Sequence, residues 1–145
     1  MRAGRAPVWV HGGGYMTGGG TLPMYDGGRL AADGDVVVSI DYRLGALGYL
    51  VHKGVSDGNL GLYDQILALE WVHDNIAAFG GDPANITVFG RSAGASSAIA
   101  LLSVPRSLRL IRRVTHRARR LWRRSPPSTG HARPGPTSSR RPAAT

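Results

Sequence analysis

Five consecutive residues around Ser92 have the types and spacing that acyl transfer by a serine hydroxyl requires. The segment Gly90-Arg91-Ser92-Ala93-Gly94 follows the pattern Gly-x-Ser-x-Gly, which places a serine on a sharp turn between a strand and a helix. Such a turn raises the hydroxyl above the sheet and directs the helix N-terminus at developing negative charge. The pattern predicts Ser92 as a nucleophile, with Gly90 and Gly94 letting the strand and the helix pass closely.

The same pattern occurs a second time over residues 54–58, so the five-residue string alone does not identify a nucleophile. The context of Ser92 is the required one, because an apolar run over residues 86–89 precedes it and small apolar residues follow it. Ser56 instead follows a loop and precedes Asn59, which favours a role in a turn or as a cap. Ser92 is therefore the candidate nucleophile.

A second group of residues, His11-Gly12-Gly13-Gly14, follows another short apolar run. An oxyanion hole needs backbone N–H groups that point at one place, and consecutive glycines allow that backbone path without a Cβ clash. Taken alone, the run is also consistent with a flexible turn, and His11 with a packed or capping imidazole. The strand-turn-helix segment downstream favours the oxyanion hole.

Apolar runs and periodic segments predict the elements that must position these groups. Residues 7–10, 36–40 and 86–89 are apolar or β-branched runs bounded by turn residues, which predicts strands. Residues 60–79 and 93–102 are predicted to be helices. Strands that alternate with helices imply right-handed crossovers and a parallel sheet, so the predicted fold class is α/β.

The helix predicted over residues 60–79 has one apolar face. Three- and four-residue spacing places on it Leu62, Ile66, Leu69, Val72, Ile76 and Phe79. We expect Trp71 and Phe79 to be core residues and not ligand contacts. His73 falls on the solvent side of the helix and His52 in a loop, so both are expected to be exposed.

The composition excludes several classes of protein. A chain of 145 residues has the length of one domain. It contains no cysteine, which excludes disulfides, cysteine-ligated zinc and iron–sulfur clusters, and nothing in the sequence supports a metal site or a cofactor. We find no signal peptide and no run of about 20 apolar residues that would span a membrane, so the cytoplasm is the default compartment.

The net charge of +9 is unevenly distributed along the chain. All nine Asp and Glu residues lie before residue 104, whereas residues 104–145 hold twelve arginines and no acidic residue. The average composition therefore describes neither segment, and each has to be interpreted separately.

Several sequence blocks, taken in order, carry a resemblance to a known family. They are Pro7-Val-Trp-Val-His-Gly-Gly-Gly-Tyr15, Asp41-Tyr-Arg-Leu44, Gly58-Asn-Leu-Gly-Leu62 with Asp64-Gln65, and the segment from Trp71 to Ala95. From about residue 7 to Pro105 the chain resembles the type B carboxylesterases, an α/β-hydrolase family that includes cholinesterase-like enzymes. The resemblance implies a partial α/β-hydrolase fold over residues 1–105, with central parallel strands joined by crossover helices.

The resemblance also implies roles for individual residues. Ser92 matches the serine that accepts the acyl group during hydrolysis of a small carboxylic ester, through an acyl-serine intermediate. Gly13 and Gly14, together with the N–H of Ala93, match the oxyanion-hole donors, and His11-Gly12 leads into them.

Two further sites, one of them a run of three residues, are informative by comparison with the family. Asp41, Tyr42 and Arg43 match a structural turn, where we expect no catalytic role. The family usually has Glu immediately before its serine, whereas this chain has Arg91. A cation therefore stands where an anion usually contributes to the field of the site, which argues against a preference for cationic substrates.

The residues that would activate the serine are missing from the sequence. A serine hydroxyl needs a His to take its proton and a carboxylate to orient that His, and in α/β-hydrolases these follow the serine in the order acid, then His. After Ser92 there is no Asp or Glu, and the only histidines are His116 and His131. We expect a truncated chain that is inactive alone.

Residues 106–145 form an Arg- and Pro-rich tail that we expect to be disordered or out of frame, since GC-rich DNA gives this composition in a shifted reading frame. Alternatively, residues 106–124 form a basic amphipathic helix that binds polyanions or membrane surfaces nonspecifically. Its apolar side would consist of Leu110, Ile111, Val114, Ala118 and Leu121. No motif indicates specific nucleic-acid binding. A third possibility is a non-catalytic α/β-hydrolase module that acts as a binding protein.

Overall fold

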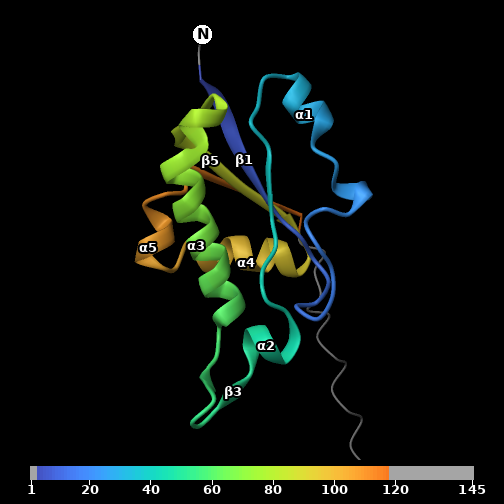
Figure 1. Ribbon diagram of the computed structural model, residues 1–145, viewed down its shortest axis with the longest axis vertical. Helices are drawn as coiled ribbons and strands as arrows, with labels where there is room; N and C mark the ends of the chain where they lie inside the picture. Colours follow the sequence, from blue (N-terminus) through green and yellow to red (C-terminus); the bar gives the residue numbers. More distant parts are fainter. Residues whose placement is uncertain (1–2, 118–145) are drawn as a thin grey trace, which may run out of the picture.

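The computed structural model describes residues 3–117, which form a four-stranded parallel sheet with helices on both sides (Figure 1). The elements in chain order are β1 (Gly4–Val10), η1 (Pro23–Tyr25), α1 (Gly28–Ala32), β2 (Val38–Ile40), α2 (Gly45–Tyr49), β3 (Val51–His52), β4 (Ser56–Asp57), α3 (Leu60–Asn75), η2 (Ile76–Phe79), β5 (Gly81–Arg91), α4 (Ala93–Leu101), α5 (Pro105–Leu108) and β6 (Arg113–Arg117). In Figure 1, α3 runs alongside β1 and β5, and α1 lies on the other side of these strands.

The sheet has the strand order β2-β1-β5-β6, and each neighbouring pair is parallel. The last residue of β1, Val10, pairs with Ile40 of β2 and with Gly90 of β5. Because parallel strands end at the same edge of a sheet, the segments after β1 and β5 emerge side by side. The α/β class and the parallel sheet predicted from the sequence are confirmed.

Alternation along the central strands explains why the core lies on one face of the sheet. Ala6, Val8 and Val10 of β1 are fully buried, as are Ile86 and Val88 of β5. They pack against the apolar faces of α3 and α4, which contribute Ile66, Leu69, Val72, Ala98 and Leu101. The intervening residues of the strands face the other side of the sheet.

That other face is only partly covered. Trp9 and Phe89, from β1 and β5, are half-buried there, and their ring centroids lie 5.0 Å apart. Tyr25 of η1 contacts Trp9 at 4.9 Å, and Leu30 of α1 remains 39% exposed. The short η1 and α1 thus leave an aromatic surface beside the C-terminal edge of the sheet.

The predicted strands and helices are all present, but two predicted core residues are exposed. Trp71 is 53% exposed and Phe79 is 64% exposed, so their assignment to the core was wrong. Trp71 projects from α3 away from the buried neighbours Leu69 and Val72. The α-helix ends at Asn75, and Phe79 lies at the end of the 3₁₀ turn η2, off the apolar face. His73 and His52 are exposed, as predicted.

The segment after Pro105 differs from the helix considered for residues 106–124. It forms only the short α5 and then β6, which extends the sheet as the parallel neighbour of β5. A strand forms because Val114 packs against the core while Thr115, the next residue, is exposed, which is the two-residue period of a sheet. Residues 118–145, including the rest of the predicted tail, lie outside the described residues.

Side-chain contacts hold α5 against the body of the fold. The buried Ser107 hydroxyl donates to the carbonyl oxygen of Leu101 at 2.6 Å. Arg106 donates two hydrogen bonds to Glu70 of α3, at 2.9 and 2.7 Å, and this pairing lowers the pKa of the Glu70 carboxyl. The connection from α4 to β6 is therefore fixed at its midpoint.

Candidate active site

Ser92 occupies the junction between β5 and α4, since β5 ends at Arg91 and α4 begins at Ala93. Its backbone has φ 57° and ψ −120°, a conformation that residues other than glycine rarely adopt. The residue is half-buried. The sharp strand-to-helix turn predicted by the Gly-x-Ser-x-Gly pattern is present, and it holds its serine in a strained backbone geometry.

Two glycines of the pattern are required by close packing at this turn. A β-carbon built on Gly90 would lie 2.6 Å from the carbonyl carbon of Gly94 and 2.8 Å from the carbonyl oxygen of Val10. One built on Gly94 would overlap the Val10 carbonyl oxygen and lie 2.7 Å from that of His11. The first turn of α4 therefore packs directly on the end of β1 as well as on β5.

The loop after β1 lies against Ser92. A β-carbon on Gly12 would be 3.3 Å from the Cβ of Ser92. Gly13 and Gly14 have φ values of +124° and +63° and are exposed. Among the hydrogen bonds of residues 3–117, none uses the backbone N–H of Gly13, Gly14 or Ala93 as donor. Three unpaired N–H groups thus flank the serine.

His11 is part of the scaffold of this loop. Its side chain is 1% exposed, and its Nδ1 lies 2.8 Å from the carbonyl oxygen of Gly12, which requires a proton on Nδ1. The other ring nitrogen is 3.8 Å from Asp41, beyond hydrogen-bond distance. This is the packed imidazole considered from the sequence.

Tyr42 supports the same loop, a role that sequence reasoning missed. Its hydroxyl donates to the carbonyl oxygen of His11 at 2.8 Å, and its ring stacks on the His11 ring at 4.5 Å. Burial, with smaller contributions from nearby tyrosines, raises the pKa of the Tyr42 phenol well above its usual range. Asp41 accepts the N–H of Gly20 at 2.7 Å, so the turn after β2 holds both ends of the loop.

The same turn is tied to α3 through an ion pair. Arg43 donates to Asp64 from its backbone N–H and from two guanidinium nitrogens, at 2.9, 2.8 and 2.7 Å. The hydrogen bonds from this side chain lower the pKa of the Asp64 carboxyl. Residues 41–43 thus form a structural turn in which each side chain makes a contact.

The structure brings the predicted nucleophile and the glycine loop together. Among the side chains that it describes, those of residues 3–115, none forms a hydrogen bond with Oγ of Ser92. His116 lies in β6, where its backbone is paired in register with Gly90. His131 lies outside the described residues.

The second Gly-x-Ser-x-Gly segment has a different structure. Ser56 begins the short strand β4, which pairs with β3 in a separate two-stranded sheet. Its hydroxyl accepts the N–H of Gly58 at 3.0 Å. The hydroxyl of Ser56 thus makes a local contact with the backbone two residues ahead, and of the two serines only Ser92 lies between a strand and a long helix.

Neither a metal cluster nor a membrane-spanning helix is found between residues 3 and 117. No three His, Cys, Asp or Glu side chains in this part of the chain come together as metal ligands. None of its helices has both the length and the apolar character needed to cross a bilayer.

A parallel sheet with a strained serine between a strand and a helix, beside a glycine loop, defines the α/β-hydrolase class of proteins. The model of the carboxylesterase family matches residues 5–117. This chain belongs to the carboxylesterase family. The match extends past Pro105, where the resemblance in the sequence blocks ended, to the last residue of β6.

Relatives and a solved structure agree with this assignment. The chain is 55% identical over 103 residues to para-nitrobenzyl esterase of Bacillus subtilis, covering 68% of this chain and 21% of the relative. It is 54% identical over 109 residues to mouse (Mus musculus) cholinesterase, covering 73% and 18%. It is similar to the crystal structure of a Geobacillus stearothermophilus carboxylesterase, with a TM-score of 0.74 and 47% identity, covering 79% and 26%. The chain thus spans about a fifth to a quarter of each.

Proposed function

We propose that this chain provides the serine nucleophile and the oxyanion hole of a carboxylic ester hydrolase. In this reaction the Ser92 oxygen bonds to the ester carbonyl carbon, the alcohol leaves, and water then releases the acid from the acyl-serine. The observation that carries the proposal is the strained placement of Ser92 at the start of α4, against the glycine loop. Membership of the carboxylesterase family supports it.

The oxyanion hole in this proposal consists of the N–H groups of Gly13, Gly14 and Ala93. Negative charge develops on the carbonyl oxygen when the serine attacks, and each such donor typically contributes about 3–4 kcal/mol to transition-state stabilisation. The three N–H groups have no acceptor among the described residues. They can therefore bind the oxyanion without first breaking a hydrogen bond within this part of the chain.

Activation of the serine requires groups that this sequence does not supply. Of its histidines, His11 is buried against Gly12 and Tyr42, and no Asp or Glu follows Ser92. Without a base, Ser92 remains a weak nucleophile. We therefore propose that the 145-residue polypeptide alone has no Ser92-dependent esterase activity, and that a carboxylesterase containing this segment has such activity.

A chimera tests the proposal. Residues 5–117 would replace the equivalent segment of the Bacillus subtilis para-nitrobenzyl esterase, which supplies the remainder of the fold. Hydrolysis of p-nitrophenyl acetate is then measured for the chimera and for two serine variants. Ser92→Ala should lower kcat by about 10⁴-fold or more, whereas Ser56→Ala, in the second Gly-x-Ser-x-Gly segment, should leave kcat unchanged.

The outcomes separate the alternatives. A folded chimera whose activity survives Ser92→Ala would contradict the nucleophile assignment. A folded but inactive chimera would favour a non-catalytic module that acts as a binding protein. Turnover by the isolated 145-residue chain that disappears in Ser92→Ala would contradict the proposed inactivity of the polypeptide alone.

A further inference from the structure

A cavity of about 580 Å³ adjoins the turn that carries Ser92. Its lining residues include Trp9, Tyr25 and Phe89, together with Gly90 and Arg91. The size lies within the range of small-molecule sites. Arg91 immediately precedes Ser92 in the chain, so the cavity adjoins the turn of the candidate nucleophile, although Ser92 itself does not line it.

The position of Arg91 follows from strand alternation in β5. Val88 is buried on the helix-covered face, so Phe89 and Arg91 belong to the opposite, partly covered face. Arg91 is exposed. Among the ion pairs and side-chain hydrogen bonds of residues 3–115, whose side chains the structure describes, none includes Arg91. Its positive charge therefore has no partner within the described part of the chain.

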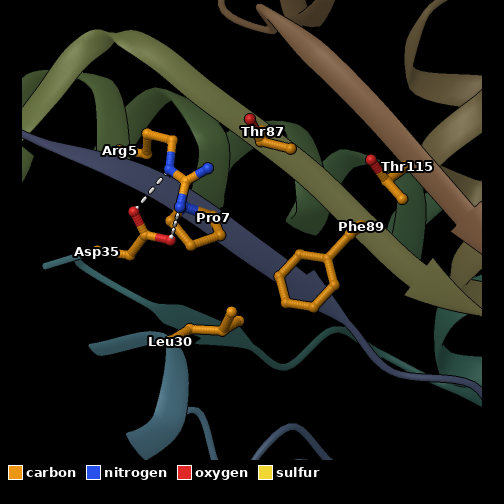
Figure 2. A pocket seen from close by; sticks show the side chains of 7 residues that line it. All are labelled: Arg5, Pro7, Leu30, Asp35, Thr87, Phe89 and Thr115. Atoms are coloured by element: carbon orange, nitrogen blue, oxygen red, sulfur yellow. Dashed lines mark hydrogen bonds and ion pairs between the residues drawn. The ribbon is translucent and has the colours of Figure 1, made fainter. Parts of the chain in front are cut away.

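The neighbouring pocket on the same face provides an internal contrast (Figure 2). It shares Phe89 and Thr115 with the larger cavity and also contains one arginine, Arg5. Figure 2 shows Arg5 directed at Asp35, to which it donates two hydrogen bonds at 2.8 and 2.9 Å. The charge of Arg5 is thus neutralised locally, whereas that of Arg91 is available to a ligand.

We infer that the cavity between Arg91 and the Trp9–Tyr25–Phe89 rings binds an aromatic carboxylate. A guanidinium donates two parallel hydrogen bonds to a carboxylate, and the three rings offer faces and edges for a planar apolar ring. Together they give the cavity one guanidinium group and three aromatic rings. The link to catalysis rests on the proposed function: ester substrates with an anionic aromatic group would be preferred in a carboxylesterase that contains this segment.

Calorimetric titration of the full chain tests the site without requiring catalysis. The two probes, 2-naphthoate and 2-naphthamide, have similar shapes and differ in charge. We expect naphthoate to bind about fivefold more tightly than naphthamide at low salt, because one exposed charge pair is worth about that factor. Arg91→Gln should remove the preference without weakening naphthamide binding, and Arg91→Glu should reverse it.

The matched control is Arg112→Gln. Arg112 is also exposed and lies just before β6, at the opposite end of the sheet from Arg91, so this variant removes one charge without touching the cavity. It should keep the naphthoate preference within about twofold of the unmodified chain. Equal losses in Arg91→Gln and Arg112→Gln, or no preference in the unmodified chain, would overturn the inference.

A Ser92→Ala variant separates this inference from the proposed function. Naphthoate should bind it as tightly as it binds the unmodified chain, because Arg91 and the rings are unchanged. If the preference depends on Arg91 while the chimera shows no esterase activity, the anion site stands and the proposed function fails. If the chimera is active but Arg91→Gln leaves the preference intact, only the anion site fails.

Discussion

Gly12 and Ser92 face each other where the glycine loop meets the strand-to-helix turn: a β-carbon on Gly12 would lie 3.3 Å from the Cβ of Ser92 and 2.6 Å from the carbonyl oxygen of Arg91. The two segments lie so close together that only a residue without a side chain fits at position 12. The donors that follow Gly12 are held close to the serine only because no side chain intervenes.

Gly12→Ala should destabilise the protein by about 1–3 kcal/mol, because the added methyl group overlaps backbone that cannot move freely. Gly12 has a negative φ, and replacing such a glycine with alanine normally stabilises a protein by about 0.4–1 kcal/mol. The expected change in the free energy of unfolding therefore has the opposite sign from the usual one. Urea unfolding measures the change. Gly28→Ala is the control, because its β-carbon would meet only the flexible Asp26 carboxylate, at 3.2 Å, and it should not destabilise.

Ser92→Gly should be more stable than Ser92→Ala by about 1 kcal/mol. The positive φ of Ser92 is unfavourable for any residue with a β-carbon and is readily adopted by glycine. Both variants remove the hydroxyl, so their difference isolates the backbone strain. Urea midpoints that are equal, or that favour alanine, would show that the turn costs no free energy.

Tyr42→Phe should lower the free energy of unfolding by about 1–2 kcal/mol, because the buried His11 carbonyl loses its donor. In the chimeric esterase the same change should lower kcat more than it raises KM, since it loosens the loop that holds Gly13 and Gly14. Tyr15→Phe is the matched control. Its ring packs against Tyr49, and among the described residues its hydroxyl makes no hydrogen bond.

Asp64→Asn should reduce stability at pH 7 by about 1–2 kcal/mol and reduce it less at low pH. Arg43 depresses the pKa of Asp64 in the folded chain, so the unfolded chain binds the proton more readily. The stabilisation that the ionised Asp64 provides is complete above about pH 5, and it is lost as the pH falls through the pKa of Asp64 in the folded chain. Urea unfolding at pH 7 and pH 3 measures this.

The control for the pH experiment is Asp33→Asn, because Asp33 is exposed and accepts no side-chain hydrogen bond among the described residues. Its variant should track the unmodified chain at both pH values. If Asp64→Asn loses as much stability at pH 3 as at pH 7, the ionised carboxylate of Asp64 is not the stabilising species.

Retention on heparin should depend on the seven arginines between residues 118 and 145. Replacing all seven with Gln should lower the salt concentration that elutes the protein, because fewer counterions are released on binding. The replacement spares α5 and β6, which belong to the folded part of the chain. Elution at an unchanged salt concentration would exclude the tail as the cause of retention.

The parts of the candidate site that could be predicted from the sequence are those that depend on local residue spacing. The turn at Ser92 and the loop at Gly13 and Gly14 depend on glycines at fixed spacing, and this spacing can be recognised in the sequence. The clamp between Tyr42 and His11 spans 31 residues, so only the fold brings its two members together. The segment from Asp41 to Arg43 was predicted to be a structural turn, but the hydrogen bond from Tyr42 to His11 was not predicted.

Physical reasons also explain where the structure differs from the sequence-based predictions. Trp71 and Phe79 were placed in the core because they are large and apolar, although only the face of α3 toward the sheet is buried. Residues 113–117 form a strand because they pair with β5, a tertiary partner that local periodicity does not reveal. The anion site proposed at Arg91 could not be inferred from the sequence, because it depends on which face of β5 lacks a covering helix.

The pairing of Val10 with Gly90 has a consequence for engineering. Each of these residues immediately precedes one half of the site, so the hydrogen-bond ladder between the two central strands sets the separation of the serine from its amide donors. A slip of one residue would displace one half by about 3.3 Å. Among the described strands, β2 and β6 contribute neither half, so substitutions at their exposed positions Ser39 and Arg113 can be introduced while the reactive geometry is preserved.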